Sequence, residues 1–210
     1  MKRTPGQVTL QPAKTGIFDH LIADLVFDTD PSVFGCLVRN DRELFSRWIT
    51  PLWQSAECSY SHDCATIALE DGELLGFEQG YSGGLRPFLE NQSGKGAAGL
   101  FSGDLLAHVM TCSQHLNYVV PFVPKSAYYV HLLSIRAENR GQGLGRKLLE
   151  NAFKQAAESG FKSVHLDVYE GNPAIGFYEN MGMEKWLETR FPAMQALWEI
   201  PPHFRMVKTL

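Results

Sequence analysis

The sequence predicts a mixed α/β fold: one central, twisted and largely antiparallel sheet of about seven strands, flanked by helices. Two observations predict it. Segments with the alternating pattern of strands and segments with the period of helices follow one another along the chain. The strand-like segments 128–135 and 162–168 also flank a long amphipathic helix, and such a βαβ unit places its two strands parallel.

The predicted strands are runs of apolar, aromatic and branched residues bounded by turn-forming residues. They comprise residues 7–10, 64–70, 73–81, 128–135, 162–168, 183–189 and 203–208. Asp71-Gly72 is a typical hairpin turn, so the strands on either side of it form an antiparallel pair. The Pro-containing loop 191–202 joins the last two strands.

Two helices are predicted before the hairpin. The first is an apolar stripe from Ile17 to Val26. The second covers residues 40–53, with Asn40 or Asp41 as its cap and Pro51 limiting its end.

Two further helices follow the strand 128–135. One extends from Leu144 to Ser159, where Ser159-Gly160 is a stop signal. The other is short and ends at Gly182, with Asn172 as its cap and Pro173 at its first position.

Residues 82–124 interrupt this pattern. The segment begins as a Gly- and Ser-rich loop and becomes amphipathic from Leu100 to Leu116. Loops this long inside a compact domain are usually functional or partly disordered. Two hypotheses stay open: a peripheral insertion or dimer contact, and a lid over a binding pocket.

The composition indicates a single soluble domain over residues 1–210, with 44% hydrophobic and 20% charged residues. A net charge of −4 argues against nucleic acid as a partner. The N-terminus lacks the apolar region of a signal peptide, and no apolar run approaches a membrane span. Four scattered cysteines are typical of buried thiols in a reducing compartment, so we predict a cytoplasmic protein without a metal site.

A glycine-rich turn, Arg140-Gly141-Gln142-Gly143-Leu144-Gly145, leads from the strand 128–135 into the next helix. Such a turn gathers unpaired backbone N–H groups at the positive end of a helix, which is an arrangement that binds phosphate. It is not the dinucleotide fingerprint, because Arg146 stands where a third glycine is needed, and the chain has no P-loop. The turn does match R-x-x-G-x-G.

A second motif follows at the spacing of a βαβ unit. Residues 172–183, NPAIGFYENMGM, are similar to N-x-x-A-x-x-F-Y-x-x-x-G-F, with Met183 in place of the usual aromatic residue. Together the two motifs resemble the acyl-CoA-binding core of the GNAT superfamily of N-acetyltransferases. The resemblance covers residues 64–81 and 125–190 well, the N-terminal part loosely and the insertion 82–124 not at all.

The resemblance implies acetyl-CoA as cosubstrate. Backbone N–H groups of residues 141–146 would hold its pyrophosphate. The end of the central strand would pair with the pantetheine arm, and an N–H near Leu133 would polarise the acetyl carbonyl, provided that the two parallel strands splay apart. The implied cofactor-binding residues are Leu133, Ser134, Ile135, Arg140, Gly141, Gln142, Gly143, Leu144, Gly145, Arg146, Asn172 and Tyr178.

Tyr178 and His131 are the candidate catalytic residues. The resemblance implies that Tyr178 donates a hydrogen bond or proton to the departing sulfur, whereas an ordinary helical tyrosine would pack in the core. His131 interrupts an apolar strand on the face of Tyr129 and Leu133, and histidine suits a base near neutral pH. It also matches a histidine of serotonin N-acetyltransferase in position. Glu78 and a water chain remain alternatives, as does a purely structural His131.

The predicted activity is acetyl transfer to a primary amine of a small molecule or peptide by direct attack in a ternary complex, without a covalent cysteine intermediate. The alternative is a non-catalytic acyl-CoA-binding or regulatory module on the same scaffold. Within the predicted acetyltransferase domain, residues 82–124 are expected to form an acceptor lid or a dimer contact, and a homodimer is possible. Aromatic candidates for the acceptor pocket are Trp48, Trp53, Tyr81 and Phe88.

Overall fold

The computed structural model describes residues 7–16 and 18–210. Ile17 of the first predicted helix and residues 1–6 of the predicted N-terminus lie outside the described residues. The helices are α1 (Asp19–Phe27), α2 (Pro31–Val38), α3 (Arg42–Gln54), α4 (Arg86–Leu100), α5 (Gly103–Leu116), α6 (Leu144–Glu158), α7 (Ile175–Asn180) and α8 (Pro192–Trp198), with 3-10 turns η1 (His62–Cys64) and η2 (Ala137–Asn139). The strands are β1 (Thr9–Pro12), β2 (Ala65–Glu70), β3 (Glu73–Ser82), β4 (Ala127–Ile135), β5 (Ser163–Tyr169), β6 (Glu184–Thr189) and β7 (His203–Thr209).

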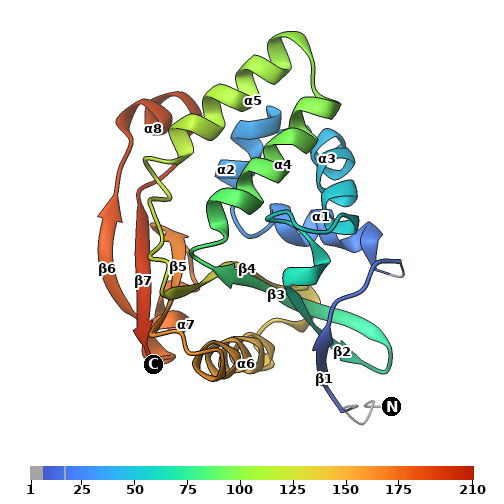
Figure 1. Cartoon of the computed structure of the whole chain (residues 1–210), viewed down its shortest axis with the longest axis vertical. Helices are drawn as coiled ribbons and strands as arrows, with labels where there is room; N and C mark the ends of the chain where they lie inside the picture. The colour runs from blue at the N-terminus through green and yellow to red at the C-terminus, as the bar shows by residue number, and fades with distance from the viewer. Residues whose placement is uncertain (1–6, 17) are drawn as a thin grey trace.

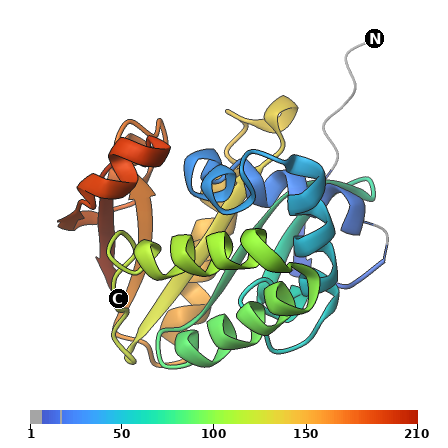
Figure 2. The ribbon, with the colours of Figure 1, turned by 90° about the horizontal axis from the view of Figure 1, so that it is seen from above.

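The described strands form one seven-stranded sheet in the order β1-β2-β3-β4-β5-β7-β6. All neighbours are antiparallel except β4 and β5, so the predicted fold class is confirmed. Helices α1 to α5 stand on one face of the sheet and α6 covers the other (Figures 1 and 2). Each face therefore has its own apolar core, one against α1, α2, α3 and α5, and one against α6 and α7.

The parallel strands β4 and β5 stay together only at their beginning. Their register starts at Ala127 opposite Ser163 and ends at Tyr129 opposite His165. Beyond this point each strand continues without the other, which leaves backbone groups on both edges for another partner. The two parallel strands therefore splay apart, as pairing of β4 with a pantetheine arm requires.

A β-bulge at His131 changes the faces that β4 presents. Val130 lies opposite Gly80 and Leu132 opposite Gln79, so His131 is the extra residue of the bulge. Leu132 consequently joins the core under α1 and α3, whereas Leu133 packs on the α6 side. The prediction that His131 shares a face with Leu133 is wrong, because the bulge shifts the alternation by one residue.

The predicted Gly- and Ser-rich loop after β3 is in fact helix α4, with Pro87 in its first turn. Glycine lowers helix propensity by about 1 kcal/mol per residue, which is why the sequence pattern looked irregular. Packing compensates, because a Cβ at Gly96 would lie 2.7 Å from Leu52 Cδ2 of α3. The small residue lets the two helices approach closely. The amphipathic segment predicted after Leu100 is helix α5.

Four smaller predictions also need correction. Residues 31–38, left without a helix, form α2, whose cap is Asp30. Pro51 lies inside α3 and does not end it, since the helix continues to Gln54. The loop 191–202 contains α8, and the short helix α7 starts at Ile175, after Asn172. Pro192 is the first residue of α8, and Asn172 and Pro173 lie in the turn that precedes α7, so prolines at helix starts were taken here for loop or cap signals.

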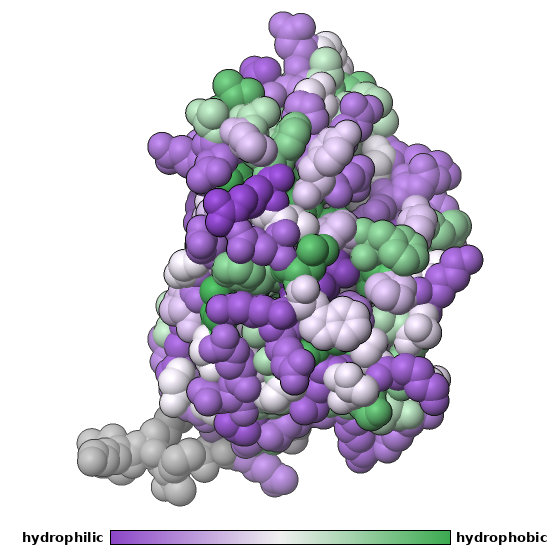
Figure 3. All heavy atoms as spheres, turned by 90° about the vertical axis from the view of Figure 1, so that its left-hand side faces the viewer, coloured by the Kyte–Doolittle hydropathy of each residue, from purple (hydrophilic) through white to green (hydrophobic). Residues whose placement is uncertain are grey.

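Within the described ranges, no helix combines the length and the apolar character that a membrane crossing needs. The side of the molecule that faces the viewer in Figure 3 carries hydrophobic residues scattered among many hydrophilic ones. β6 is one of the two edge strands of the described sheet, and its Trp186 and Leu187 are exposed. The predicted homodimer stays a prediction.

Candidate active site

A cavity of about 1000 Å³ opens where β4 and β5 diverge. One part is lined by the end of β4, the glycine-rich turn and α7, and the other by α2, α3, α4 and α5. The cavity is large enough for two small ligands side by side. The insertion 82–124 therefore forms one wall of the cavity.

The glycine-rich turn presents its backbone to this cavity. Gly141 and Gly143 have φ of 76° and 78°, and a Cβ at either position would meet nothing within 4 Å. The first bond of helix α6 that closes over the turn runs from Lys147 N–H to the Gly143 carbonyl, at 3.2 Å. In the part of the chain that the structure describes, the six N–H groups of residues 141–146 donate to no protein acceptor. This row of free donors at a helix start fits a pyrophosphate.

Eleven of the twelve predicted cofactor-binding residues line the cavity, and Gln142 is the exception. The Gln142 side chain instead donates to the Glu138 carbonyl at 3.4 Å. Asn172 lines the cavity, but its Oδ1 accepts from Ala174 N–H at 2.8 Å. It also stands two residues before Ala174, one fewer than in the family segment. The local turn therefore accounts for Asn172 without a ligand.

Tyr178 enters the cavity from α7 and is 8% exposed. Among the described residues its hydroxyl has no hydrogen-bond partner, and it is not sealed from solvent. Burial raises the pKa of Tyr178 to about 12. The phenol thus stays protonated and keeps a free donor inside the cavity.

His131 also lines the cavity, and its tautomer follows from its partner. Nδ1 lies 3.0 Å from the Ser59 carbonyl, which can only accept, so Nδ1 carries the proton. Burial, assisted by the positive charge of Arg86, lowers the pKa of His131 to about 4. The ring is therefore neutral near physiological pH. Nε2 has a free lone pair, with no partner in the described chain.

The model of the acetyltransferase (GNAT) family matches residues 35–183, which is well over half of the chain. The chain belongs to the GNAT family. Acetyl transfer is thus its general chemistry. No curated protein matches it by sequence.

Solved GNAT structures share this fold at low identity. The N-acetyltransferase from Staphylococcus aureus Mu50 is 15% identical with a TM-score of 0.73, covering 95% of this chain and 100% of that one. Mosquito arylalkylamine N-acetyltransferase like 5b is 16% identical with a TM-score of 0.63, covering 97% and 100%. Drosophila melanogaster polyamine N-acetyltransferase, which forms N-acetylagmatine, is 15% identical with a TM-score of 0.62, covering 97% and 100%.

Glu78, the alternative base, does not line the cavity of this GNAT protein. It lies opposite Leu133 on the α6 side of the sheet, 1% exposed, and accepts from the Tyr128 hydroxyl at 3.1 Å. Burial raises the pKa of Glu78 to about 8. Its surroundings are those of a buried structural carboxyl group, on the face of the sheet away from His131.

Of the four aromatic residues predicted for the acceptor pocket, only Trp48 lines the cavity. Trp53 is buried and donates to Asp19 at 3.1 Å, Tyr81 is buried, and Phe88 is 46% exposed. The aromatic residues that line the cavity beside Trp48 are Phe34, Tyr60, Tyr129, Tyr169, Phe177 and Tyr178.

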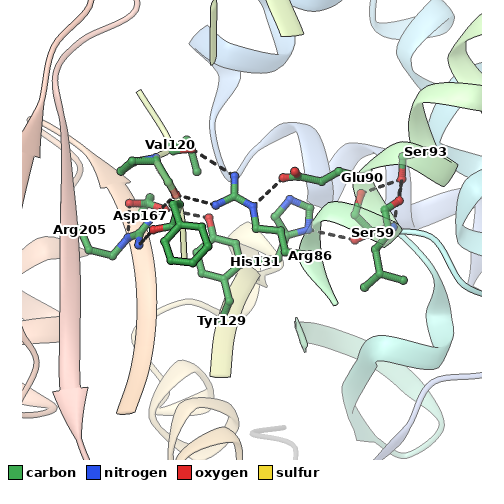
Figure 4. Close-up of polar contacts among 12 residues, drawn as sticks. Ser59, Arg86, Glu90, Ser93, Val120, Tyr129, His131, Asp167 and Arg205 are labelled. Carbon is green, nitrogen blue, oxygen red and sulfur yellow. Dashed lines mark hydrogen bonds and ion pairs between the residues drawn. The ribbon is translucent and has the colours of Figure 1, made fainter. Parts of the chain in front are cut away.

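Helix α4 supplies side chains that sequence reasoning missed. Arg86, Glu90, Ser93 and Ala97 line the cavity and share one helical face. Their spacing of four, three and four residues was the available signal, hidden by the glycines between them. Figure 4 shows Arg86 and Glu90 of α4 beside His131 of β4, and Ser93 of α4 beside Ser59.

Two buried arginines bracket Tyr129. Arg86 lies 5.1 Å and Arg205 5.7 Å from its ring centre, measured from each guanidinium carbon. The Tyr129 hydroxyl donates to Asp167 at 2.9 Å, and Arg205 holds the same carboxylate through two bonds of 2.7 and 2.8 Å. Burial and the Asp167 charge raise the pKa of Tyr129 well above its usual value, so this ring stays neutral.

Every carboxylate that lines the cavity is already paired with a basic side chain. Asp28 pairs with Arg42 at 3.0 Å, and Asp30 with His203 at 2.9 Å. The other two pairs join Glu90 to Arg86 at 2.7 Å and Asp167 to Arg205 at 2.7 Å. The described lining thus offers no unpaired acid to a second positive charge on a ligand.

Proposed function

We propose that this GNAT protein transfers an acetyl group from acetyl-CoA to a primary amine, by direct attack with both substrates bound. One observation carries the proposal. A single cavity contains both the row of free backbone N–H groups at residues 141–146 and the side chains of His131 and Tyr178. A shared cavity lets donor and acceptor meet without a covalent enzyme intermediate.

The cofactor half of the cavity fits CoA. The N–H groups of residues 141–146 would bind the pyrophosphate, with Arg140 and Arg146 adding positive charge. The open edge of β4 from Leu133 to Ile135 would pair with the amide groups of pantetheine. Bound there, acetyl-CoA supplies an acetyl thioester to the reaction.

His131 is proposed to bind the amine and take its proton. An alkylammonium ion has a pKa of about 10, so His131, with its pKa near 4, cannot deprotonate it beforehand. The neutral amine instead donates a hydrogen bond to Nε2. As the carbon–nitrogen bond forms, the nitrogen becomes positively charged and far more acidic, and His131 can then accept its proton.

Tyr178 is proposed to stabilise the departing sulfur. Its pKa of about 12 lies above that of a thiol, about 8.5, so full proton transfer to a thiolate is unfavourable. A hydrogen bond from the neutral phenol still disperses the charge that develops on sulfur.

The acceptor half of the cavity favours a monoamine with an apolar or aromatic body. Phe34, Trp48 and Tyr60 form its walls, and Phe34 and Trp48 each lie within 6.5 Å of the Tyr60 ring centre. A diamine or polyamine would bring a second cation to carboxylates that are already paired, where it binds weakly. This distinguishes the proposal from the polyamine activity of the Drosophila relative.

The test measures CoA release from acetyl-CoA with apolar monoamines, diamines, polyamines and peptide amines. Wild type should turn over monoamines with the highest kcat/KM, and Tyr178→Phe should lower kcat about a hundredfold with little change in the KM for acetyl-CoA. Unchanged kcat in Tyr178→Phe removes the tyrosine from the mechanism. Tight CoA binding without turnover of any amine would support the rival function, a non-catalytic acyl-CoA-binding module.

A further inference from the structure

The His131 side chain, on the bulge of β4, is oriented by a contact with Ser59, which lies in the loop between α3 and β2. Among the residues that the structure describes, its one polar contact joins Nδ1 to the Ser59 carbonyl, at 3.0 Å. Its other close neighbours are aromatic rings, with centres 5.2 Å away at Tyr60, 5.5 Å at Tyr81 and 6.0 Å at Tyr129. Aromatic faces offer no strong acceptor for Nδ1–H. The Ser59 carbonyl therefore decides which nitrogen keeps the proton.

Ser59 is in turn held by Ser93 of α4. Ser93 Oγ accepts from Ser59 N–H at 3.0 Å and lies 2.7 Å from Ser59 Oγ. It is also 3.2 Å from the Leu89 carbonyl, to which it can donate. One consistent arrangement satisfies all of these groups: Ser93 donates to Leu89 and accepts twice from Ser59. Both serines are buried, with exposures of 5% and 2%.

Helix α4 is itself anchored, so Ser93 can act as a fixed support. At its first turn Arg86 donates to the Pro121 carbonyl at 2.8 Å and to the Val120 carbonyl at 3.2 Å. Farther along, Gly96 lies against Leu52 of α3. Figure 4 shows the resulting line of contacts from Ser93 through Ser59 to His131.

We propose that Ser93 is a positioning residue for His131: acting through Ser59, it fixes the Nδ1–H tautomer and leaves Nε2 open toward the acceptor. This inference rests on the proposed role of His131. Without Ser93, the Ser59 N–H and hydroxyl are left buried and unpaired, and the loop must move to satisfy them. The carbonyl then leaves Nδ1, and His131 samples both tautomers.

The experiment uses imidazole nitrogen NMR of isotope-labelled full-length protein without ligands, with His131→Gln to assign the signals. Wild type should show one tautomer, with the proton on Nδ1. Ser93→Ala should show averaged tautomers, and its kcat should fall about tenfold while the KM for acetyl-CoA changes less than about twofold. Ser93→Thr keeps the hydroxyl and should restore both properties.

Ser55→Ala is the matched control, because Ser55 also bonds the carbonyl four residues earlier, at 2.7 Å, but has no link to His131. It should leave both spectrum and kcat unchanged. A wild-type tautomer in Ser93→Ala overturns the proposal. If Ser93→Ala does not fold, Ser93→Cys decides the question, since it nearly keeps the size of the side chain but its sulfur is only a weak hydrogen-bond acceptor. An unaltered tautomer and kcat in Ser93→Cys overturn the proposal.

The NMR spectra are recorded without turnover, so they test the role of Ser93 independently of the proposed acetyltransferase activity. Absence of amine acetylation by wild type contradicts the proposed function, whatever the tautomer of His131.

Discussion

His131 and Tyr178 bring opposite proton affinities into one cavity. Burial lowers the pKa of the imidazole to about 4 and raises that of the phenol to about 12. Because each change favours the uncharged form, both groups stay neutral over the whole range between these values. One residue can then only accept a hydrogen bond at its free nitrogen, and the other can donate one at its hydroxyl.

The first prediction concerns the pH dependence of kcat/KM for the amine. His131 is neutral above about pH 5, so it should give no inflection near the ordinary histidine pKa of about 6.5. The rate should instead rise about tenfold per pH unit below the pKa of the amine, because only the neutral amine attacks. Two acceptors of different pKa check this, since the inflection should move with the acceptor.

An inflection near pH 6.5 that is the same for both amines and disappears in His131→Gln would contradict this assignment. It would mean that the imidazole is protonated in the resting protein.

Single residues were predictable from the sequence where a motif fixed their place. Tyr178 and the glycines of the turn line the cavity as predicted, although their roles stay predictions. Ser93 and Arg86 carry no motif, and only the folded chain brings Ser93 to Ser59, 34 residues away along the sequence. The prediction for Gln142 concerns its backbone N–H and stays a prediction, while its side chain donates to the Glu138 carbonyl.

At the scale of elements, the contact between β3 and β4 holds the proposed pantetheine strand in place. Gly76 lies opposite Ile135, and a Cβ at Gly76 would collide with the Ser134 carbonyl. Since the obstacle is backbone, a side chain can be accommodated only if β4 moves. The glycine thus sets the separation of the two strands beside the cofactor half of the cavity.

We therefore expect Gly76→Ala to destabilise the protein by about 2 kcal/mol and to weaken CoA binding about tenfold. Calorimetry of unfolding and titration with CoA measure the two effects. Gly99→Ala in α4 is the control, because its Cβ would meet nothing within 4 Å, and it should leave CoA affinity unchanged. Normal CoA affinity in Gly76→Ala would show that β4 adapts without disturbing the site.

The other face of the sheet gives a prediction about stability. The pKa of Glu78 is raised to about 8 in the folded protein from an ordinary 4.5. Between these values the folded state holds a proton that the unfolded state has lost, so this group's contribution to stability decreases as pH rises. Glu78→Gln has no titrating carboxyl group and avoids this decrease in stability. It should therefore raise the Tm by about 5 °C near pH 8, with little effect near pH 5.

Thermal unfolding at both pH values checks the sign. A Tm increase that is equal at both values would mean that Glu78 is not protonated by burial. Acetyl transfer should continue in Glu78→Gln, since the residue lies outside the cavity.

The elements with regular patterns were predictable, and the irregular ones were not. All seven strands were placed with small errors at their ends, because alternation and turn residues mark them locally. Helix α4 was mistaken for a loop because its stability comes from packing against α3 and the sheet, and not from the helix propensity of its own residues. The bulge at His131 leaves no mark in the sequence, so the face of Leu133 was predicted wrongly.

At the scale of the whole molecule, Arg205 ties the end of the insertion to the sheet, and Arg86 ties it to α4. The carbonyl of Pro121 accepts from Arg86 at 2.8 Å and from Arg205 at 2.9 Å, and Arg205 also reaches the Phe122 carbonyl at 3.1 Å. Thr189 of β6 donates to the Val119 carbonyl at 2.6 Å. The end of the insertion is thereby fixed to α4, β6 and β7 together.

Asp167 balances the positive charge of Arg205, which is buried with 4% of its surface exposed. Asp167→Asn leaves a buried guanidinium without its counter-charge and should destabilise the protein by about 3 kcal/mol in denaturant unfolding. Glu150→Gln breaks the exposed pair with Arg146 and should change stability by less than about 0.5 kcal/mol. Similar small effects in both variants would show that Arg205 is adequately solvated without Asp167.

The large-scale arrangement was predictable only as far as the family resemblance reached. The sheet and the βαβ unit follow from it, whereas the insertion lies outside the resemblance and its role as one wall of the cavity emerged from the fold. The cytoplasmic location and the independence from metal stay predictions.

The grip of Arg205 on Phe122 spans 83 residues of sequence. During synthesis on the ribosome, both motifs and the entire insertion emerge well before β7. A nascent chain halted after α7 would already contain the glycine-rich turn and Tyr178. It would still lack Arg205, which holds the end of the insertion through the Pro121 and Phe122 carbonyls. Acetyltransferase activity should consequently appear late in synthesis, once β7 has paired with β5 and β6.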